Sequence, residues 1–325
     1  MTIRDQHDRT ISYLRLSVTD RCNLRCLYCT PPASKAAPEY RGLLSFDDLF
    51  RIAEVSVTLG MRKIRVTGGE PLTRPGIVQF LERVHGIEGI GELVLTTNGM
   101  LLSRMAKDLH EAGVKRLNIS LDSLRSGRFA QLTGGGSLDK LLAGIEAARE
   151  AGFPPPQLNT VIMRGFNEDE ISDFAALSER TGMAVRFIEY MPVNADPKWR
   201  DSFFSCAEML DVLSRQYDLL PEEQLHGAGP ARYYKLGGTQ GKIGVISPIS
   251  KHFCAHCNRL RITADGFARS CLFSSQGADL RPFLSQDNEA LRKALTAIVH
   301  AKPASHNLTP DLAAAGFVPM SAIGG

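Results

Sequence analysis

The chain has 325 residues, a net charge of +3 and a hydrophobic fraction of 43%, which suits one large α/β domain with an appendage, or two domains. The small charge disfavours a protein that coats nucleic acid, and no apolar run approaches the roughly 18 residues of a membrane span. The polar start "MTIRDQHDRTIS" has no signal-peptide core, so we expect a cytoplasmic protein whose partners include neither nucleic acid nor membrane.

Segments rich in β-forming residues alternate with helical patterns up to about residue 191. We expect strands at 11–18, 63–67, 92–97, 115–120, 157–163 and 184–191. A helix is predicted to begin at Ser45, where S-F-D-D is a capping signature. One buried helix face is predicted from Leu138, Leu141, Leu142, Ile145 and Ala148. Six strand–helix units indicate a parallel sheet, which is either an incomplete (β/α)₆ barrel or an open doubly wound sheet.

Small and polar residues cluster where these strands end. Gly68 and Gly69 follow the second strand, and Asn98 follows the third. The other strands contribute Ser120, Asp122, Asn159, Thr160, Arg186 and Glu189. Because ligand sites of parallel α/β proteins lie at the carboxyl ends of the strands, this convergence predicts a functional site there.

The pattern changes after Met191. A helix is expected near 205–215, a hairpin is formed by "RLRIT", "ADG" and "FARSCLF", and a last helix is expected around 286–300. Turn-forming residues place a boundary near 230–245. We therefore predict a domain at 1–235 that carries the first cysteine set, and a C-terminal α+β segment at 236–325 that carries the second.

The seven cysteines form two sets and one isolated residue. The sets are Cys22, Cys26 and Cys29, and Cys254, Cys257 and Cys271. A reducing compartment disfavours a disulfide framework, so metal or cluster ligation is the leading interpretation of both sets. Cys206, in "FFSCAEML", is predicted to be an ordinary structural thiol of a helix.

The spacing CxxxCxxC favours an iron–sulfur cluster in the first set. Three thiolates can hold three corners of a [4Fe–4S] cube and leave the fourth iron open. A structural zinc site usually needs four ligands, and no fourth Cys or His lies nearby. In the second set, His252 and His256 flank Cys254, so residue counting leaves both a Cys₃His zinc site and a cluster open.

Basic residues lie close to the second set. Arg259 and Arg261 are two apart in a predicted strand, so both side chains leave the same face. Paired guanidiniums match the oxygens of phosphate, although a solvated basic strand edge is the alternative. Lys63 and Arg65 share a face of the second strand in the same way, and Lys63 is equally well explained as a solvent-facing residue.

The motifs also resemble known families. "CNLRCLYC" after one strand and "GGEP" after the next are similar to the radical S-adenosylmethionine (SAM) superfamily. "LRLSVTDRCNLRCLYC", "KIRVTGGEPLTR", "LTTNG", "LNISLDSL", "RFIEYMPV", "CAHCNRLRITADG" and the terminal "IGG" resemble the GTP 3′,8-cyclase family, also called molybdenum cofactor biosynthesis protein A. The resemblance spans about 11–325 and implies an incomplete (β/α)₆ TIM-like barrel whose open side is closed by the C-terminal segment.

The resemblance implies a lyase that converts GTP to (8S)-3′,8-cyclo-7,8-dihydroguanosine 5′-triphosphate, early in molybdenum cofactor biosynthesis. A 5′-deoxyadenosyl radical from SAM would take the 3′ hydrogen of GTP. The implied cofactors are SAM and two [4Fe–4S] clusters. The implied partners are a flavodoxin-like one-electron donor and the next enzyme, cyclic pyranopterin monophosphate synthase, and the expected state is a monomer or homodimer.

The resemblance also implies residue roles. Cys22, Cys26 and Cys29 would hold the SAM cluster, and Cys254, Cys257 and Cys271 would hold a second cluster whose open iron meets guanine. The SAM-binding residues would be Tyr28, Gly69, Ser120 and Met191. The GTP-binding residues would be Arg15, Arg65, Thr96, Arg259, Leu260 and Arg261. Catalytic roles would fall on Arg259, Arg261 and the terminal Gly324 and Gly325.

One position departs from the family pattern. The family usually has a lysine where this chain has Gln157, and that lysine reaches the triphosphate. A neutral amide loses the charge-assisted part of the hydrogen bond, about 1 kcal/mol or more. We expect weaker GTP binding at this position or compensation by another cation.

Two rival functions fit the sequence less well. A radical SAM peptide-maturing enzyme with auxiliary clusters usually has a more cysteine-rich C-terminal region and no Gly-Gly end. A non-catalytic protein with two zinc knuckles for RNA or a partner predicts zinc instead of iron, and a more basic and aromatic surface.

Overall fold

The computed structural model describes residues 2–29, 42–192, 199–223, 229–274, 276–306, 308 and 320. Their strands form one 12-stranded sheet in the order β12-β11-β10-β1-β2-β3-β4-β5-β6-β9-β8-β7. The strands are β1 Tyr13–Ser17, β2 Lys63–Thr67, β3 Glu92–Thr97, β4 Arg116–Ser120, β5 Gln157–Ile162, β6 Val185–Glu189, β7 Leu219–Pro221, β8 Arg232–Leu236, β9 Lys242–Ile246, β10 Arg259–Ile262, β11 Phe267–Arg269 and β12 Ala278–Asp279. The helices are α1 Phe46–Thr58, α2 Ile77–His85, α3 Leu102–Glu111, α4 Ser126–Thr133, α5 Leu138–Glu150, α6 Ile171–Thr181, α7 Cys206–Ser214, α8 Arg281–Leu284 and α9 Asn288–His300.

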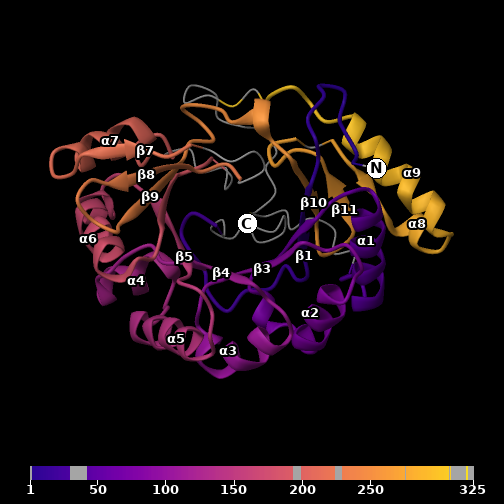
Figure 1. Cartoon of the computed structure of the whole chain (residues 1–325), viewed down its shortest axis with the longest axis horizontal. Helices are drawn as coiled ribbons and strands as arrows, with labels where there is room; N and C mark the ends of the chain where they lie inside the picture. Colours follow the sequence, from indigo (N-terminus) through magenta and orange to yellow (C-terminus); the bar gives the residue numbers. More distant parts are fainter. Residues whose placement is uncertain are drawn as a thin grey trace.

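Strands β1 to β6 neighbour one another in chain order, and all of these pairs are parallel. In Figure 1 the strands curve around the centre of the view, while α1, α2, α3, α5 and α6 lie outside them. A doubly wound sheet reverses its strand order at a switch point and carries helices on both faces. The structure is therefore an incomplete barrel and not a doubly wound sheet, as the resemblance implied.

The C-terminal segment adds a strand to each edge of this arch. β10 runs parallel to β1, with Tyr13 opposite Arg259, and β9 runs parallel to β6, with Val185 opposite Ile243. The chain between β9 and β10 thus joins the two edges, which confirms that this segment closes the open side. β9 could not be predicted from the sequence, because glycines surround it. The proposed boundary at 235/236 falls within β8 and stays a prediction.

Local signals account for the helix ends and the core. Ser45 caps α1 as predicted, accepting from the Asp48 N–H (3.0 Å) while the Asp48 carboxylate accepts from the Ser45 N–H (3.3 Å). The predicted buried face of α5 was wrong at Leu142, which is 45% exposed. Gly144 is buried instead, because the absence of a side chain lets α5 pack closely against the start of α3. None of the helices in the described ranges is long and apolar enough to cross a bilayer.

Candidate functional site

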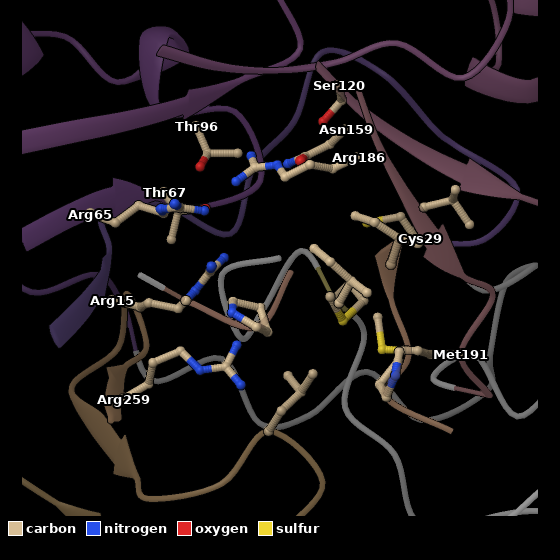
Figure 2. A pocket seen from close by; sticks show the side chains of 18 of the residues that line it. Arg15, Cys29, Arg65, Thr67, Thr96, Ser120, Asn159, Arg186, Met191 and Arg259 are labelled. Carbon is tan, nitrogen blue, oxygen red and sulfur yellow. The ribbon is translucent and has the colours of Figure 1, made fainter. Parts of the chain in front are cut away.

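One cavity is lined by the parallel strands and the loops that follow them, and both cysteine sets open onto it. Figure 2 shows Arg15, Arg65 and Arg259 on one side of this cavity and Cys29 and Met191 on the opposite side. The structure therefore brings residues that are more than 200 positions apart to the walls of one cavity. The predicted convergence of the strand ends is confirmed.

The first cysteine loop, residues 20–29, is held by backbone contacts to the end of α4. The Arg25 and Leu27 N–H groups donate to the carbonyls of Thr133 and Leu132, both at 2.9 Å. The Asn98 side chain approaches Cys22 Sγ at 3.7 Å. Burial raises the pKa of Cys26, so its thiol stays neutral unless a cation is bound. Three thiols at one cavity wall fit the three corners of a cluster, because metal ions supply the charge that ionises them.

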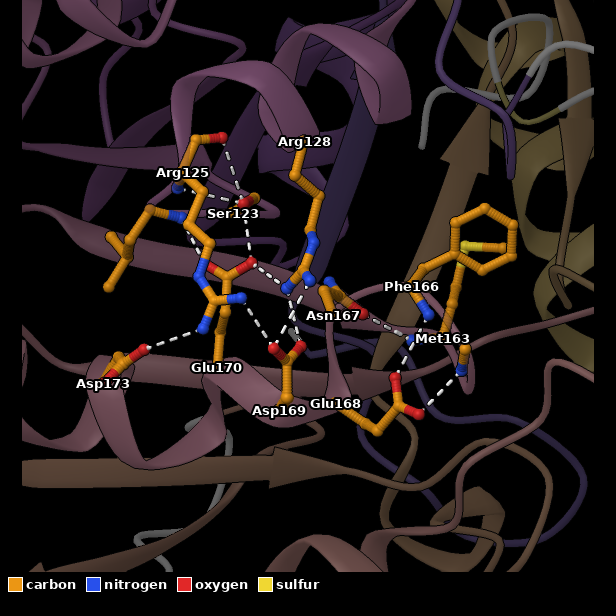
Figure 3. A network of polar contacts seen from close by, with 12 residues as sticks. Ser123, Arg125, Arg128, Met163, Phe166, Asn167, Glu168, Asp169, Glu170 and Asp173 are labelled. Atoms are coloured by element: carbon orange, nitrogen blue, oxygen red, sulfur yellow. Dashed lines mark hydrogen bonds and ion pairs between the residues drawn. The ribbon is translucent and has the colours of Figure 1, made fainter.

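A buried carboxylate network holds α4 itself in place (Figure 3). Glu170 is inaccessible to solvent and accepts from the Ser123 hydroxyl (2.7 Å), the Leu124 N–H (2.6 Å) and the Arg128 guanidinium (2.6 Å). Arg128 also pairs with Asp169 at 2.6 Å. Because the last turn of α4 carries the carbonyls that hold the cysteine loop, this network lies behind the loop and supports it.

The two glycines after β2 pack against the same loop. A Cβ on Gly69 would lie 2.3 Å from the Arg21 carbonyl oxygen, and one on Gly68 would lie 2.6 Å from that of Thr19. The next residue, Glu70, is buried and accepts from the Asn98 N–H at 2.7 Å and the Thr97 hydroxyl at 2.8 Å. Burial raises the pKa of Glu70 to about 7. The glycines are thus required by a close approach of backbones, and Glu70 joins the ends of β2 and β3.

Substituting Gly69→Ala should destabilise the apoprotein by about 1–3 kcal/mol, because the added methyl group meets backbone that cannot move aside freely. Iron uptake on reconstitution should fall with it. Gly127→Ala is the matched control, because a Cβ added there would have nothing within 4 Å, and alanine in a helix is favoured by about 1 kcal/mol. Urea unfolding and iron analysis measure both effects; wild-type values for Gly69→Ala would refute the close-packing explanation.

The four residues expected at SAM all line this cavity: Tyr28, Gly69, Ser120 and Met191. The Tyr28 hydroxyl donates to Asp122 at 2.7 Å. Burial, followed by the charge of Asp122, raises the pKa of Tyr28, so the phenol remains protonated as the donor. The contact ties the cysteine loop to the segment after β4. The roles of Tyr28, Gly69, Ser120 and Met191 in binding SAM stay predictions.

The second cysteine set lies beside Arg259. Its guanidinium is 3.7 Å from Cys257 Sγ. Burial alone would raise the pKa of Cys257, but Arg259 and Lys302 lower it to about 6. A thiolate is therefore available at neutral pH, and Cys254 and Cys271 line the same wall. This donor set also fits three corners of a cluster.

For a zinc site near the second cysteine set, the structure offers a different group of ligands from the one expected from the sequence. His252, Cys254 and His306 place one potential ligand atom each within 4.8 Å of one another. Burial and the neighbouring His252 lower the pKa of His306 to about 4, so its imidazole is neutral. His256, which sequence analysis considered, is exposed and is not in this group. The second histidine of the group is His306, which lies about 50 positions further along the chain than His256.

A row of arginines crosses three neighbouring strands. Arg15 on β1 lies opposite Arg261 on β10 and Arg65 on β2. All three are buried and line the cavity. Burial, followed by the charge of Arg261, lowers the pKa of Arg15, and burial followed by Arg259 lowers the pKa of Arg261 to about 10. Buried like charges at this density are costly unless a multivalent anion joins them.

Arg186 is a further cation of the cavity; the sequence placed it among the polar residues at the strand ends without giving it a specific role. It lies on β6, is 6% exposed and donates to the Asn118 side chain at 2.7 Å, while its Nε is buried without a hydrogen-bond partner. The oxygen of Asn159 and the hydroxyl of Thr96 are also buried without partners. Such orphaned groups around one cavity point to a polar ligand. Strand alternation indicates this orientation, because Arg186 leaves β6 on the face opposite to Val185 and Phe187, which lie in the hydrophobic core.

The remaining predicted residues are placed as follows. Arg259 and Arg261 leave the same face, as expected, whereas the Leu260 side chain lies in the hydrophobic core. Lys63 pairs with Glu92 at 2.7 Å. Cys206 is 1% exposed within the core, which confirms the structural interpretation.

Gln157 is the first residue of β5 and is not among the described cavity residues. Gly324 and Gly325 lie outside the described residues, although Met320 lines the cavity.

Comparisons with known proteins define the class first. The family model of the Radical SAM superfamily matches residues 16–177, and the model Molybdenum Cofactor Synthesis C matches residues 183–308. Among solved structures, Streptococcus suis SuiB bound to S-adenosylmethionine is 14% identical with a TM-score of 0.61, covering 92% of this chain and 66% of SuiB. The open parallel arch with a cysteine triad at its cavity is thus a radical SAM fold.

Closer relatives define the family. A GTP 3′,8-cyclase of Geobacter sulfurreducens is 51% identical over 326 residues, covering 100% of both chains. One of Thermodesulfovibrio yellowstonii is 43% identical over 329 residues, covering 99% of this chain and 100% of the relative. The chain belongs to the GTP 3′,8-cyclase family, a family of radical SAM enzymes. The resemblance seen in the motifs is confirmed.

Proposed function

We propose that this chain converts GTP to (8S)-3′,8-cyclo-7,8-dihydroguanosine 5′-triphosphate in molybdenum cofactor biosynthesis. One observation carries the proposal: two cysteine triads and a row of buried arginines open onto the same cavity. A radical SAM enzyme needs only the first triad. The arginines and the second triad add a place for an anionic substrate beside a second metal group, which supports GTP.

The arginine row would bind the triphosphate. Arg15, Arg65 and Arg261 present guanidiniums from adjacent strands, and planar forked donors match phosphate oxygens. The strands hold these side chains in register, so little reorganisation accompanies binding. Arg259, nearer the second triad, would reach the part of the nucleotide closest to that metal group.

The residues around the first triad would position SAM opposite the nucleotide. When bound, SAM and its cluster supply the radical that removes the 3′ hydrogen of the ribose. The 3′ carbon then bonds to C8 of guanine, and one electron and one proton complete the product. The chain contributes a cavity whose walls carry both triads, and these walls would limit the access of water to the reactive carbon. Tyr28, held by Asp122, fixes the cysteine loop during this step.

The cofactor set and partners belong to the same proposal. We assign a [4Fe–4S] cluster to Cys22, Cys26 and Cys29 and another to Cys254, Cys257 and Cys271. The reaction requires an outside one-electron donor, expected to be flavodoxin-like, and hands its product to cyclic pyranopterin monophosphate synthase in the cytoplasm. Met320 lines the cavity, and it precedes Gly324 and Gly325 by four and five positions in the sequence, which supports a role there for these glycines.

Anaerobic incubation of the reconstituted protein with SAM, GTP and dithionite tests the function. We expect 5′-deoxyadenosine and an isomer of GTP by mass spectrometry, with deuterium from [3′-²H]GTP recovered in deoxyadenosine. Deoxyadenosine without a GTP product would contradict the substrate and retain the radical SAM chemistry. Zinc at the second triad, found by metal analysis of anaerobically purified protein, would contradict the proposed cofactor set.

A further inference from the structure

Lys302 is a buried lysine to which neither the motifs nor the family comparison assigns a role. It follows α9 and is only 3% exposed. Its ammonium donates to the Arg259 carbonyl at 3.0 Å and to the Ser270 carbonyl. Arg259 lies two residues after Cys257, and Ser270 directly precedes Cys271. One side chain thus joins the two backbone segments that carry these cysteines.

In the described part of the chain, both hydrogen-bond partners given for the Lys302 ammonium are carbonyl oxygens, which carry no formal charge. Burial lowers the pKa of Lys302, and the charges of Cys257 and Cys271 are the ones that raise it. A buried ammonium with only carbonyl partners is costly. The nearby groups that can offset this cost are the sulfur atoms of Cys257 and Cys271, which carry negative charge when they bind a metal group.

Arg9 braces the same region from the other end of the chain. Its guanidinium donates to the carbonyls of Cys254 (2.7 Å), Ala304 (3.0 Å) and Pro303 (2.7 Å). Unlike Lys302, Arg9 is neutralised, because Asp5 accepts from its Nε at 2.6 Å. The segment 302–304 is therefore fixed against the triad, and Lys302 contributes a charge that Arg9 does not.

We propose that Lys302 is a positioning residue for the second cysteine triad and the fixed counter-charge of the cluster bound there. The inference rests on the proposed function for the presence of that cluster. A cluster with three thiolate ligands is anionic, and reduction makes it more so. A buried cation beside it favours the reduced form and raises the reduction potential.

The test uses full-length protein in which Cys22, Cys26 and Cys29 are all serine, so that only the second cluster is titrated. Lys302→Gln keeps a hydrogen-bond donor and removes the charge, whereas Lys302→Arg keeps the charge. Lys293→Met is the matched control, because this lysine lies on α9 with its side chain 76% exposed. The readouts are iron and sulfide content and an electron paramagnetic resonance titration against potential.

With Lys302→Gln, we expect the ratio of reduced to oxidised cluster at a given potential to fall on the order of tenfold, about 59 mV for a one-electron couple. Lys302→Arg and Lys293→Met should stay near the parent value. Loss of the cluster in Lys302→Gln but not in Lys302→Arg also supports the proposal. Parent potential in Lys302→Gln, or equal cluster loss in both Lys302 variants, overturns it. If the parent protein binds no second cluster, the proposed cofactor set is refuted together with the role of Lys302. This failure is distinguishable, because it is observed before any Lys302 variant is made.

Discussion

Replacing Cys26 with serine is expected to reduce formation of 5′-deoxyadenosine by at least about 1000-fold, because SAM cleavage has no electron source without the first cluster. Cys26 is the right target, since its thiol is half-buried at the cavity wall while Cys22 is exposed. The loop itself should survive, because its contacts to Thr133 and Leu132 use backbone atoms. Circular dichroism should therefore match the parent protein, and iron content should fall by about half.

Cys206→Ala is the control for this experiment. Cys206 is a buried cysteine of α7 that is absent from the described cavity lining. Its replacement should lower the free energy of unfolding by about 1 kcal/mol and leave deoxyadenosine formation unchanged. Retained SAM cleavage in Cys26→Ser, or equal loss in Cys206→Ala, would contradict the assignment of the first triad.

Replacing Arg261 with glutamine is expected to weaken GTP binding by about 10- to 100-fold, because a hydrogen bond to a charged group contributes roughly 1.5–3 kcal/mol. Arg261 lies in register with Arg15, so its loss removes one edge of the arginine row. Binding should also become less sensitive to salt, since fewer charges meet the triphosphate. Isothermal titration of the anaerobic holoenzyme with GTP at two ionic strengths measures both effects.

Arg83→Gln controls for the loss of positive charge as such. Arg83 is exposed on α2, pairs with Asp47 at 2.7 Å and is absent from the described cavity lining. GTP affinity should be unchanged in this variant. If Arg261→Gln binds GTP as the parent does, or if guanosine without phosphates loses affinity equally, the arginine row does not bind the triphosphate.

Much of the fold could be predicted because its signals are local. The strand at 63–67 and the cap at Ser45 depend on neighbours within a few residues, and both were found. β9 escaped prediction, because a glycine-rich segment becomes a strand only when β6 offers it a free edge. Leu142 was misplaced on α5, because Gly144 permits a closer approach of α3 than the apolar spacing suggests.

The class of chemistry could be inferred from the sequence alone, because the cysteine spacings and the family motifs are contiguous stretches of the chain. It also placed Arg259 and Arg261 on one face, since alternation is a property of any strand. Which residues from distant parts of the chain share the site depends on the tertiary fold. His306 lines the cavity, and Lys302 contacts the backbone beside Cys257 and Cys271. The cost of burying such groups depends on neighbours that lie far away in the sequence.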